Sequence, residues 1–331
     1  MSELTQRTYE RRWWTLAVLS LALAVISLDN MILNVALPTL VRDLNATSSQ
    51  LQWIVDSYVL VFAGLLLTAG ALGDRFGRKL ALMVGLGVFG VFSALAAMSG
   101  TANQLIATRA LMGIGGALIM PSTLSILTNV FPPAERAKAI GIWAAVNGLS
   151  IPLGPVLGGW LLEHYSWGSI FLINIPVVVV SLIAAAILVP ESRDEKALPL
   201  DPVGAVLSIA GLAALLYAII EAPSAGWTSG TTIGWFAVAA VTLGAFVLWE
   251  RRVPYPMFDT ALFKNRRFSA ASLSVTMVFF GLFGATFFLT QHMQFVLGLD
   301  TLETGVRMIP IAVGVGIAAP LSARLTARFG S

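Results

Sequence analysis

Hydrophobic residues follow one another along this chain in long blocks, and short polar stretches separate the blocks. A helix needs roughly 20 apolar residues to cross a bilayer, and about ten blocks reach that length. We expect membrane-spanning helices at residues 14–38, 51–73, 80–99, 103–129, 138–162, 169–189, 203–221, 231–249, 269–297 and 304–327. The short loops between them favour a compact helical bundle. The pattern therefore predicts an all-α polytopic membrane protein.

Composition supports this class and argues against others. The chain is 57% hydrophobic and 11% charged, whereas soluble proteins are about one quarter charged. It has no cysteine and two histidines, which argues against a disulfide framework, a transition-metal cluster and a cysteine nucleophile. It also lacks the GxxxxGK[ST] sequence of ATP-binding loops. We therefore expect no enzymatic activity, no cofactor and no metal.

Lysine and arginine lie almost entirely on one side of the predicted bundle. All 20 except Arg42, Arg109 and Arg307 fall at the N-terminus or in every second loop. Cytoplasmic loops of membrane proteins carry such an excess of positive charge. We predict a multi-pass protein of the cytoplasmic membrane with a cytoplasmic N-terminus. The net charge of +3 then reflects orientation in the lipid bilayer, and no nucleic-acid partner is expected.

Three charged side chains interrupt the apolar blocks: Asp29, Asp56 and Arg109. Counted inward from the helix ends, all three lie within roughly one turn of the same depth. A carboxylate inside the membrane costs roughly 2.5–3.5 kcal/mol, and such residues are functional by default. We interpret the three as a proton-coupling site. Two alternatives stay open: a buried arginine locks Asp29 permanently, or Asp56 sits at the membrane interface beside Trp53 and Tyr58.

Further residues of the spans are candidates for a substrate cavity. Asn30 and Asn34 are one turn apart and share a stripe of the first span. Met112, Met120 and Trp143 suit an adaptable apolar cavity. Hydrogen bonding between helices explains the asparagines equally well, and packing against protein or lipid explains the other three.

Four sequence motifs occur in order along the chain. Leu28–Pro38 reads L-D-x-x-I-x-N-V-A-L-P, and the loop after the second span matches G-x-L-x-D-R-x-G-R-K. The fourth span keeps L-x-x-x-R-x-x-Q-G, with Met112 in place of glutamine. The fifth keeps G-x-x-x-G-P-x-x-G-G, with Ser150 in place of the first glycine. The ordered set resembles the major facilitator superfamily, and within it the 14-span drug:proton antiporters.

A further signature of that family, W-R-W-x-F-x-x-N-x-P, is half kept. The matching residues are Trp167, Phe171, Asn174 and Pro176, whereas Gly168 and Ser169 replace the arginine and the second tryptophan.

The resemblance assigns roles to two of these motifs. It implies a cytoplasmic gate between two halves of a transporter, formed by Gly70, Asp74, Arg75, Gly77, Arg78 and Lys79. It also implies an antiporter motif that bends the fifth span at the interface between the halves, formed by Gly154, Pro155, Gly158 and Gly159. An ordinary basic loop and simple close helix packing are the respective alternatives.

The resemblance also implies a division of the chain. Residues 70–77 and 323–330 share Leu, Arg, Phe and Gly at matching positions, as parallel repeats of two transporter halves predict. We expect a major facilitator fold with an N-terminal six-span bundle (1–190), a linker with two spans (191–260) and the first two spans of a C-terminal bundle (261–331). In that division the chain stops before further spans, so we expect a fragment.

The predicted function is proton-coupled secondary transport that exports cationic or lipophilic drugs. A cation and a proton both favour neutralisation of a buried carboxylate, so the two compete for it. Two alternatives are export of an endogenous lipid, peptide or metabolite, and an inactive truncated membrane protein.

Overall fold

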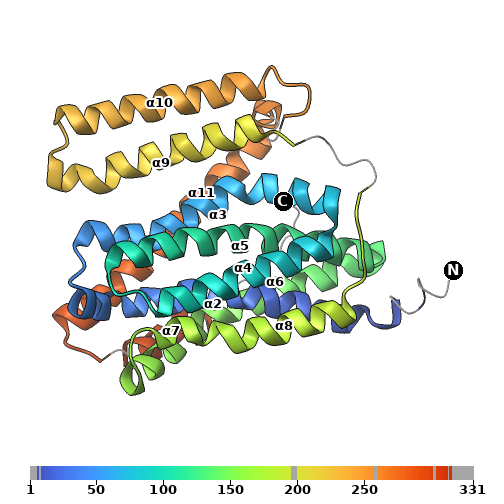
Figure 1. Ribbon diagram of the computed structural model, residues 1–331, viewed down its shortest axis with the longest axis horizontal. Helices are drawn as coiled ribbons and strands as arrows, with labels where there is room; N and C mark the ends of the chain where they lie inside the picture. The colour runs from blue at the N-terminus through green and yellow to red at the C-terminus, as the bar shows by residue number, and fades with distance from the viewer. Residues whose placement is uncertain are drawn as a thin grey trace.

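The computed structural model describes residue 6 and residues 9–194, 200–256, 260–300, 303–311 and 313–314. Within these ranges every regular element is a helix. The first six predicted spans form one bundle (Figure 1). Its helices are α2 (Arg12–Leu44), α3 (Ser48–Phe76), α4 (Arg78–Ala97), α5 (Ala102–Val130), α6 (Pro133–His164), α7 (Ser169–Leu172) and α8 (Asn174–Leu188).

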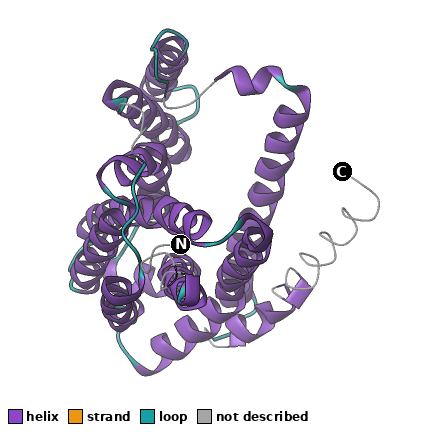
Figure 2. Cartoon of the chain, turned by 90° about the vertical axis from the view of Figure 1, so that its right-hand side faces the viewer, coloured by secondary structure: helices purple, strands orange, loops and turns teal. Residues whose placement is uncertain are grey.

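Two further units follow the bundle. Helices α9 (Pro202–Ala225) and α10 (Gly230–Glu250) form a hairpin that packs on α3. The 3-10 helix η1 (Thr260–Lys264) then leads into α11 (Arg266–Gln291) and the π-helical turn η2 (His292–Val296). Figure 2 shows α11 standing at one side of the bundle. Its membrane-spanning stretch is little covered by the rest of the described chain.

The first nine predicted spans are confirmed, because nine helices of the described residues are long and apolar enough to cross a membrane. The tenth predicted span lies mostly outside the described residues, as does the repeated sequence at 323–330. The division into three domains stays a prediction.

Small residues allow the helices of the bundle to approach closely. A Cβ atom on Gly113 of α5 would lie 2.7 Å from the carbonyl oxygen of Tyr58 on α3. One on Gly115 would lie 2.7 Å from the carbonyl oxygen of Gly85 on α4. Lipid tails are as apolar as the helices, so such van der Waals packing, rather than the hydrophobic effect, favours helix association. These glycines therefore fix α3 and α4 on either side of α5.

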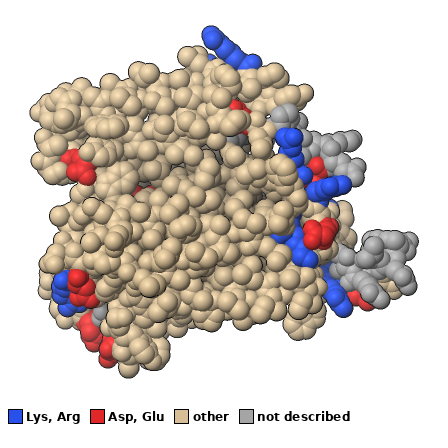
Figure 3. Space-filling view, viewed as in Figure 1, with Lys and Arg blue, Asp and Glu red and all other residues tan. Residues whose placement is uncertain are grey.

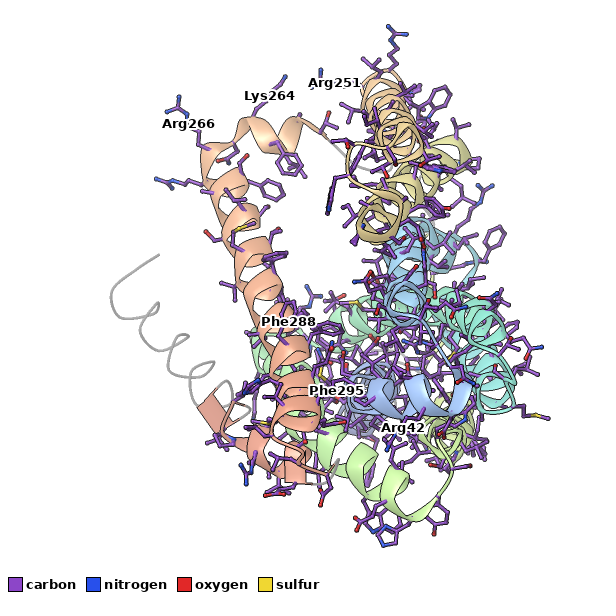
Figure 4. All side chains as sticks on the ribbon, turned by 90° about the vertical axis from the view of Figure 1, so that its left-hand side faces the viewer. Arg42, Arg251, Lys264, Arg266, Phe288 and Phe295 are labelled. Atoms are coloured by element: carbon purple, nitrogen blue, oxygen red, sulfur yellow. The ribbon has the colours of Figure 1, made fainter. Side chains whose placement is uncertain are left out.

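The charges follow the predicted sidedness. Most Lys and Arg side chains visible in Figure 3 lie at the end that holds the N-terminus. Arg251, Lys264 and Arg266 lie together in Figure 4, at the opposite end of α11 from Phe288, Phe295 and Arg42. Most basic residues thus lie at a common end, with Arg42 among the exceptions, which is the excess that the positive-inside rule describes.

Introduced cysteines test which end is cytoplasmic. The chain contains no cysteine, so each introduced thiol is the sole reporter. Cysteines at the exposed residues Ser166 and Thr228 are expected to react with a membrane-impermeant maleimide on intact cells. Those at the exposed residues Glu191 and Arg251 are expected to react only after permeabilisation. The reverse labelling pattern would place the N-terminus outside.

Candidate functional site

An ion pair between Asp29 of α2 and Arg109 of α5 lies at the centre of the bundle. Arg109 Nη1 donates to Asp29 Oδ2, and the side chains are 0% and 1% exposed for Arg109 and Asp29. The equal depth predicted from the sequence is therefore confirmed for these two residues. Isolated charges in such a site are very unfavourable, and pairing with further hydrogen bonds is what permits them.

The other two nitrogens of the Arg109 guanidinium also donate hydrogen bonds. Nε donates to the backbone carbonyl of Ile54 at 3.2 Å, and Nη2 donates to Asn30 Oδ1 at 3.3 Å. The guanidinium carbon lies 4.4 Å from the centre of the Tyr58 ring, which gives a cation–π contact. Arg109 therefore joins α2 and α3 to α5, and the charge-assisted bonds fix its position.

Asp29 has a second donor, which the predicted site did not contain. Asn174, the first residue of α8, donates through Nδ2 to Asp29 Oδ1 at 2.9 Å and is 3% exposed. The same nitrogen lies 3.0 Å from Ser93 Oγ of α4, and Ser93 Oγ donates to the carbonyl of Phe171 at 2.9 Å. In the sequence, the half-kept signature that contains Asn174 was the one feature that could have indicated a role for this residue.

Asp56 does not join this cluster. It lies two residues from both Ile54 and Tyr58, which face Arg109, and two residues correspond to about 200° around a helix. Trp53, one turn before Asp56, faces the hairpin instead, with its ring 6.2 Å from that of Tyr217 on α9. The structure therefore corrects the predicted grouping: Asp56 is half-buried on the α9 side of α3.

The antiporter motif packs directly beyond Asp29 and Asn30. A Cβ atom added at Gly154 of α6 would collide with Met31 of α2. A Cβ atom added at Gly158 would lie 3.1 Å from Ile32 Cγ2, which is a tight contact. On another side, an added Cβ at Gly305 would lie 2.5 Å from the carbonyl oxygen of Pro155. Gly159 is also buried. The motif therefore packs against α2 and against the stretch that follows η2.

The predicted cavity residues separate in the structure. Asn34 lines a pocket with Met31 and Val35 of α2, Pro155 of α6, Thr286 and Thr290 of α11, and Met308 and Ile311. Asn30 accepts from Arg109, and Met112 is fully buried with its sulfur 4.0 Å from Arg109 Nη1. Met120 and Trp143 are partly buried elsewhere on α5 and α6. Only Asn34 of the five lies in this pocket.

The loop predicted to form the gate is tied to the segment after α8. Arg78 N donates to Ser192 O at 2.9 Å, and Asp194 N donates to Asp74 O at 2.8 Å. Lys79 Nζ donates to Ala186 O at 2.9 Å.

Within that loop, Gly77 adopts a φ of 124°, which favours glycine, and Asp74 pairs with Arg78 at 2.7 Å. Gly70 lies against Pro121 of α5, whereas Arg75 is exposed.

The charges of the central site sum to zero in this arrangement. The Asp29 carboxylate accepts from Arg109 on one oxygen and from Asn174 on the other, so its ionised form is well satisfied. A proton on Asp29 would leave Arg109 as a net buried charge. The arrangement is therefore compatible both with a permanent ion pair and with a carboxylate that exchanges a proton when helices move.

Comparisons with known proteins agree with the geometry. The sequence profile of the Major Facilitator Superfamily matches residues 19–331. The chain is 41% identical over 326 residues to the multidrug efflux pump LfrA of Mycolicibacterium smegmatis, covering 98% of this chain and 64% of that protein. It is 38% identical to the methyl viologen resistance protein SmvA of Salmonella typhimurium, covering 97% of this chain and 65% of SmvA.

A third relative is the tetracenomycin C resistance and export protein of Streptomyces glaucescens, at 36% identity over 97% of this chain and 60% of the relative. The chain thus spans 60 to 65% of the length of these three relatives. Among solved structures, tetrameric PepTSo2 superposes with a TM-score of 0.59 at 15% identity, covering 94% of this chain and 71% of that one. This likeness concerns the fold alone.

A double-mutant cycle tests the ion pair. Arg109→Ala leaves Asp29 without its counter-charge, and breaking a buried pair from one side typically costs roughly 3–5 kcal/mol. We expect the double variant Asp29→Asn, Arg109→Ala to be more stable than Arg109→Ala alone, because no unpaired charge remains. The measurement is thermal stability in detergent.

Asp56→Asn is the matched control for this cycle. It makes the same chemical change in a carboxylate that does not touch Arg109, so its effect is expected to add to that of Arg109→Ala within about 0.5 kcal/mol. Additive behaviour of the Asp29 pair as well would show that Asp29 and Arg109 do not interact.

Proposed function

This chain belongs to the Major Facilitator Superfamily, and from that premise we propose that it is a proton-coupled secondary transporter that exports cationic or lipophilic drugs. The observation that carries the proposal is the Asp29–Arg109 pair, a carboxylate held inside a membrane-spanning bundle with almost no exposed surface. Intramembrane carboxylates are costly and mark ion or proton pathways. The named relatives, which are resistance, export and efflux proteins, support the class of substrate.

In this proposal Asp29 takes up and releases the proton. The neutral pair is stable while the site is closed, so proton binding requires that the distance between Asp29 and Arg109 increases. Helix α6 is suited to drive such a change, because Gly154 and Gly158 pack on the two residues after Asn30. A bend at Pro155, which interrupts the backbone hydrogen bonding of α6, would then move α2 next to the carboxylate.

The proposed drug path runs through the pocket between α2, α6 and α11. The pocket joins Asn34 to Thr286 and Thr290, so its wall combines apolar surface with a few polar groups. That mixture suits lipophilic molecules. The proposed orientation places the N-terminus and the gate loop in the cytoplasm, in line with the clustering of Lys and Arg.

Two alternatives are separated by experiment. Export of an endogenous lipid, peptide or metabolite would leave drug efflux absent but proton coupling intact. If a longer form with further spans transports and the 331-residue chain does not, the chain alone is an inactive membrane protein.

Substitution of Asp29 tests coupling. Asn keeps the volume of Asp but cannot titrate, so Asp29→Asn is expected to abolish substrate-dependent proton movement while membrane insertion is unchanged. Everted vesicles that carry a pH-sensitive dye measure this movement when ethidium is added.

Asp43→Asn is the matched control, because Asp43 is an exposed carboxylate on the same helix. It is expected to transport like the wild type. Unchanged proton movement in Asp29→Asn would overturn the proposal.

A further inference from the structure

Asn174 connects the buried carboxylate to two other helical segments. Its amide nitrogen lies 2.9 Å from Asp29 Oδ1 and 3.0 Å from Ser93 Oγ. Ser93 is 0% exposed and donates to the carbonyl of Phe171 in α7. Asn174 thus occupies a fixed position, with its amide against Asp29 and away from water.

The arrangement satisfies the ionised form of Asp29, whereas the protonated form also needs a hydrogen-bond acceptor. Ionised Asp29 accepts one donor on each oxygen. Once protonated, Asp29 carries an O–H group that needs an acceptor in a site where its residue is 2% exposed. Arg109 has donors only, and Asn30 Oδ1 and Ile54 O already accept from it. A primary amide offers both a donor and an acceptor.

We propose that Asn174 is a positioning residue for Asp29, which donates to the ionised carboxylate and, after rotation of its amide, accepts from the protonated one. The inference rests on the proposed function, which supplies the proton from the transmembrane gradient. One O–H bond forms on Asp29, the Asn174–Asp29 hydrogen bond reverses its direction, and Arg109 keeps its charge. Asn174 thereby lets Asp29 hold either protonation state without a water molecule beside it.

Few other groups near Asp29 can carry charge. Arg109 faces it from α5, and Tyr58 of α3 stacks on the Arg109 guanidinium. Helices α4 and α8 contribute Ser93 and Asn174, and α6 packs glycines on the neighbouring turn of α2. A pH-dependent effect of Asn174 therefore reports mainly on Asp29.

Thermal unfolding of the purified 331-residue chain across pH tests the inference. Asn174→Leu keeps a similar volume without a hydrogen bond, and Asn174→Ser keeps a shorter donor and acceptor. Hydrogen bonds to charged groups are roughly twice as strong as neutral ones. We therefore expect Asn174→Leu to lower the Tm more at high pH, where Asp29 is ionised, than at low pH, and Asn174→Ser to recover part of the loss.

Three comparisons decide the outcome. In the Asp29→Asn background, the pH dependence of the Asn174→Leu effect is expected to disappear. Ser93→Ala removes one partner of Asn174 together with the hydrogen bond to the Phe171 carbonyl, and its pH-dependent part is expected to act in the same direction more weakly. Ser181→Ala is the matched control, because Ser181 is a buried serine of α8 whose hydroxyl has no hydrogen-bond partner among the described residues. Its effect is expected to be independent of pH.

An equal loss of Tm at every pH, or the same pH dependence in the Asp29→Asn background, would overturn the inference and leave Asn174 with a purely structural role. Should Asn174→Leu not fold, the pH dependence of Asn174→Ser and Ser93→Ala distinguishes the same two outcomes. Unfolding does not require transport. The vesicle assay of Asp29→Asn therefore decides the proposed function separately from this inference.

Discussion

A carboxylate inside an apolar bundle has to be compensated, and the packing around Asp29 follows from that constraint. Compensation comes from Arg109 of α5 and Asn174 of α8. Arg109 in turn uses the carbonyl of Ile54 on α3. Helices α2, α3, α5 and α8 therefore converge on the Asp29 carboxylate and its partner Arg109, and a shift of any of these helices changes the hydrogen bonding of the pair. The glycines of α5 permit this convergence, because any side chain at Gly113 would push α3 away.

The sequence was sufficient for the spans and for the central pair, and insufficient for the rotation of each helix. Span lengths follow from the thickness of the bilayer, and equal depth brings Asp29 to Arg109. Depth carries no information on which side of a helix a residue faces. Asp56 lies at the depth of the pair, but its side chain points from α3 in a direction about 200° around the helix axis from Ile54 and Tyr58. Asn174 carries no charge, so the cost of burial gave no signal for it.

The surroundings of the site suggest how a change at Asp29 reaches distant parts of the chain. Immediately beyond Asn30, α2 packs on the antiporter motif of α6, which also contacts Gly305. Through Asn174, α8 is bonded to Asp29 at one end. At the other end, backbone hydrogen bonds with Asp74 and Arg78 hold the segment that follows α8. A displacement of α8 along its axis would therefore change the hydrogen bonds of both the Asp29 carboxylate and the gate loop.

The central claim is that Asp29 exchanges a proton, in contrast to an ion pair that never titrates. Infrared difference spectroscopy of the chain in lipid vesicles, recorded between high and low pH, detects the C=O band of a protonated carboxylic acid. We predict one component of this band that is present in the wild type and in Asp56→Asn and is lost in Asp29→Asn, whereas the exposed carboxylates contribute equally in all three. The same band in Asp29→Asn as in the wild type would show that Asp29 does not change its protonation state between the two pH values and would contradict the claim.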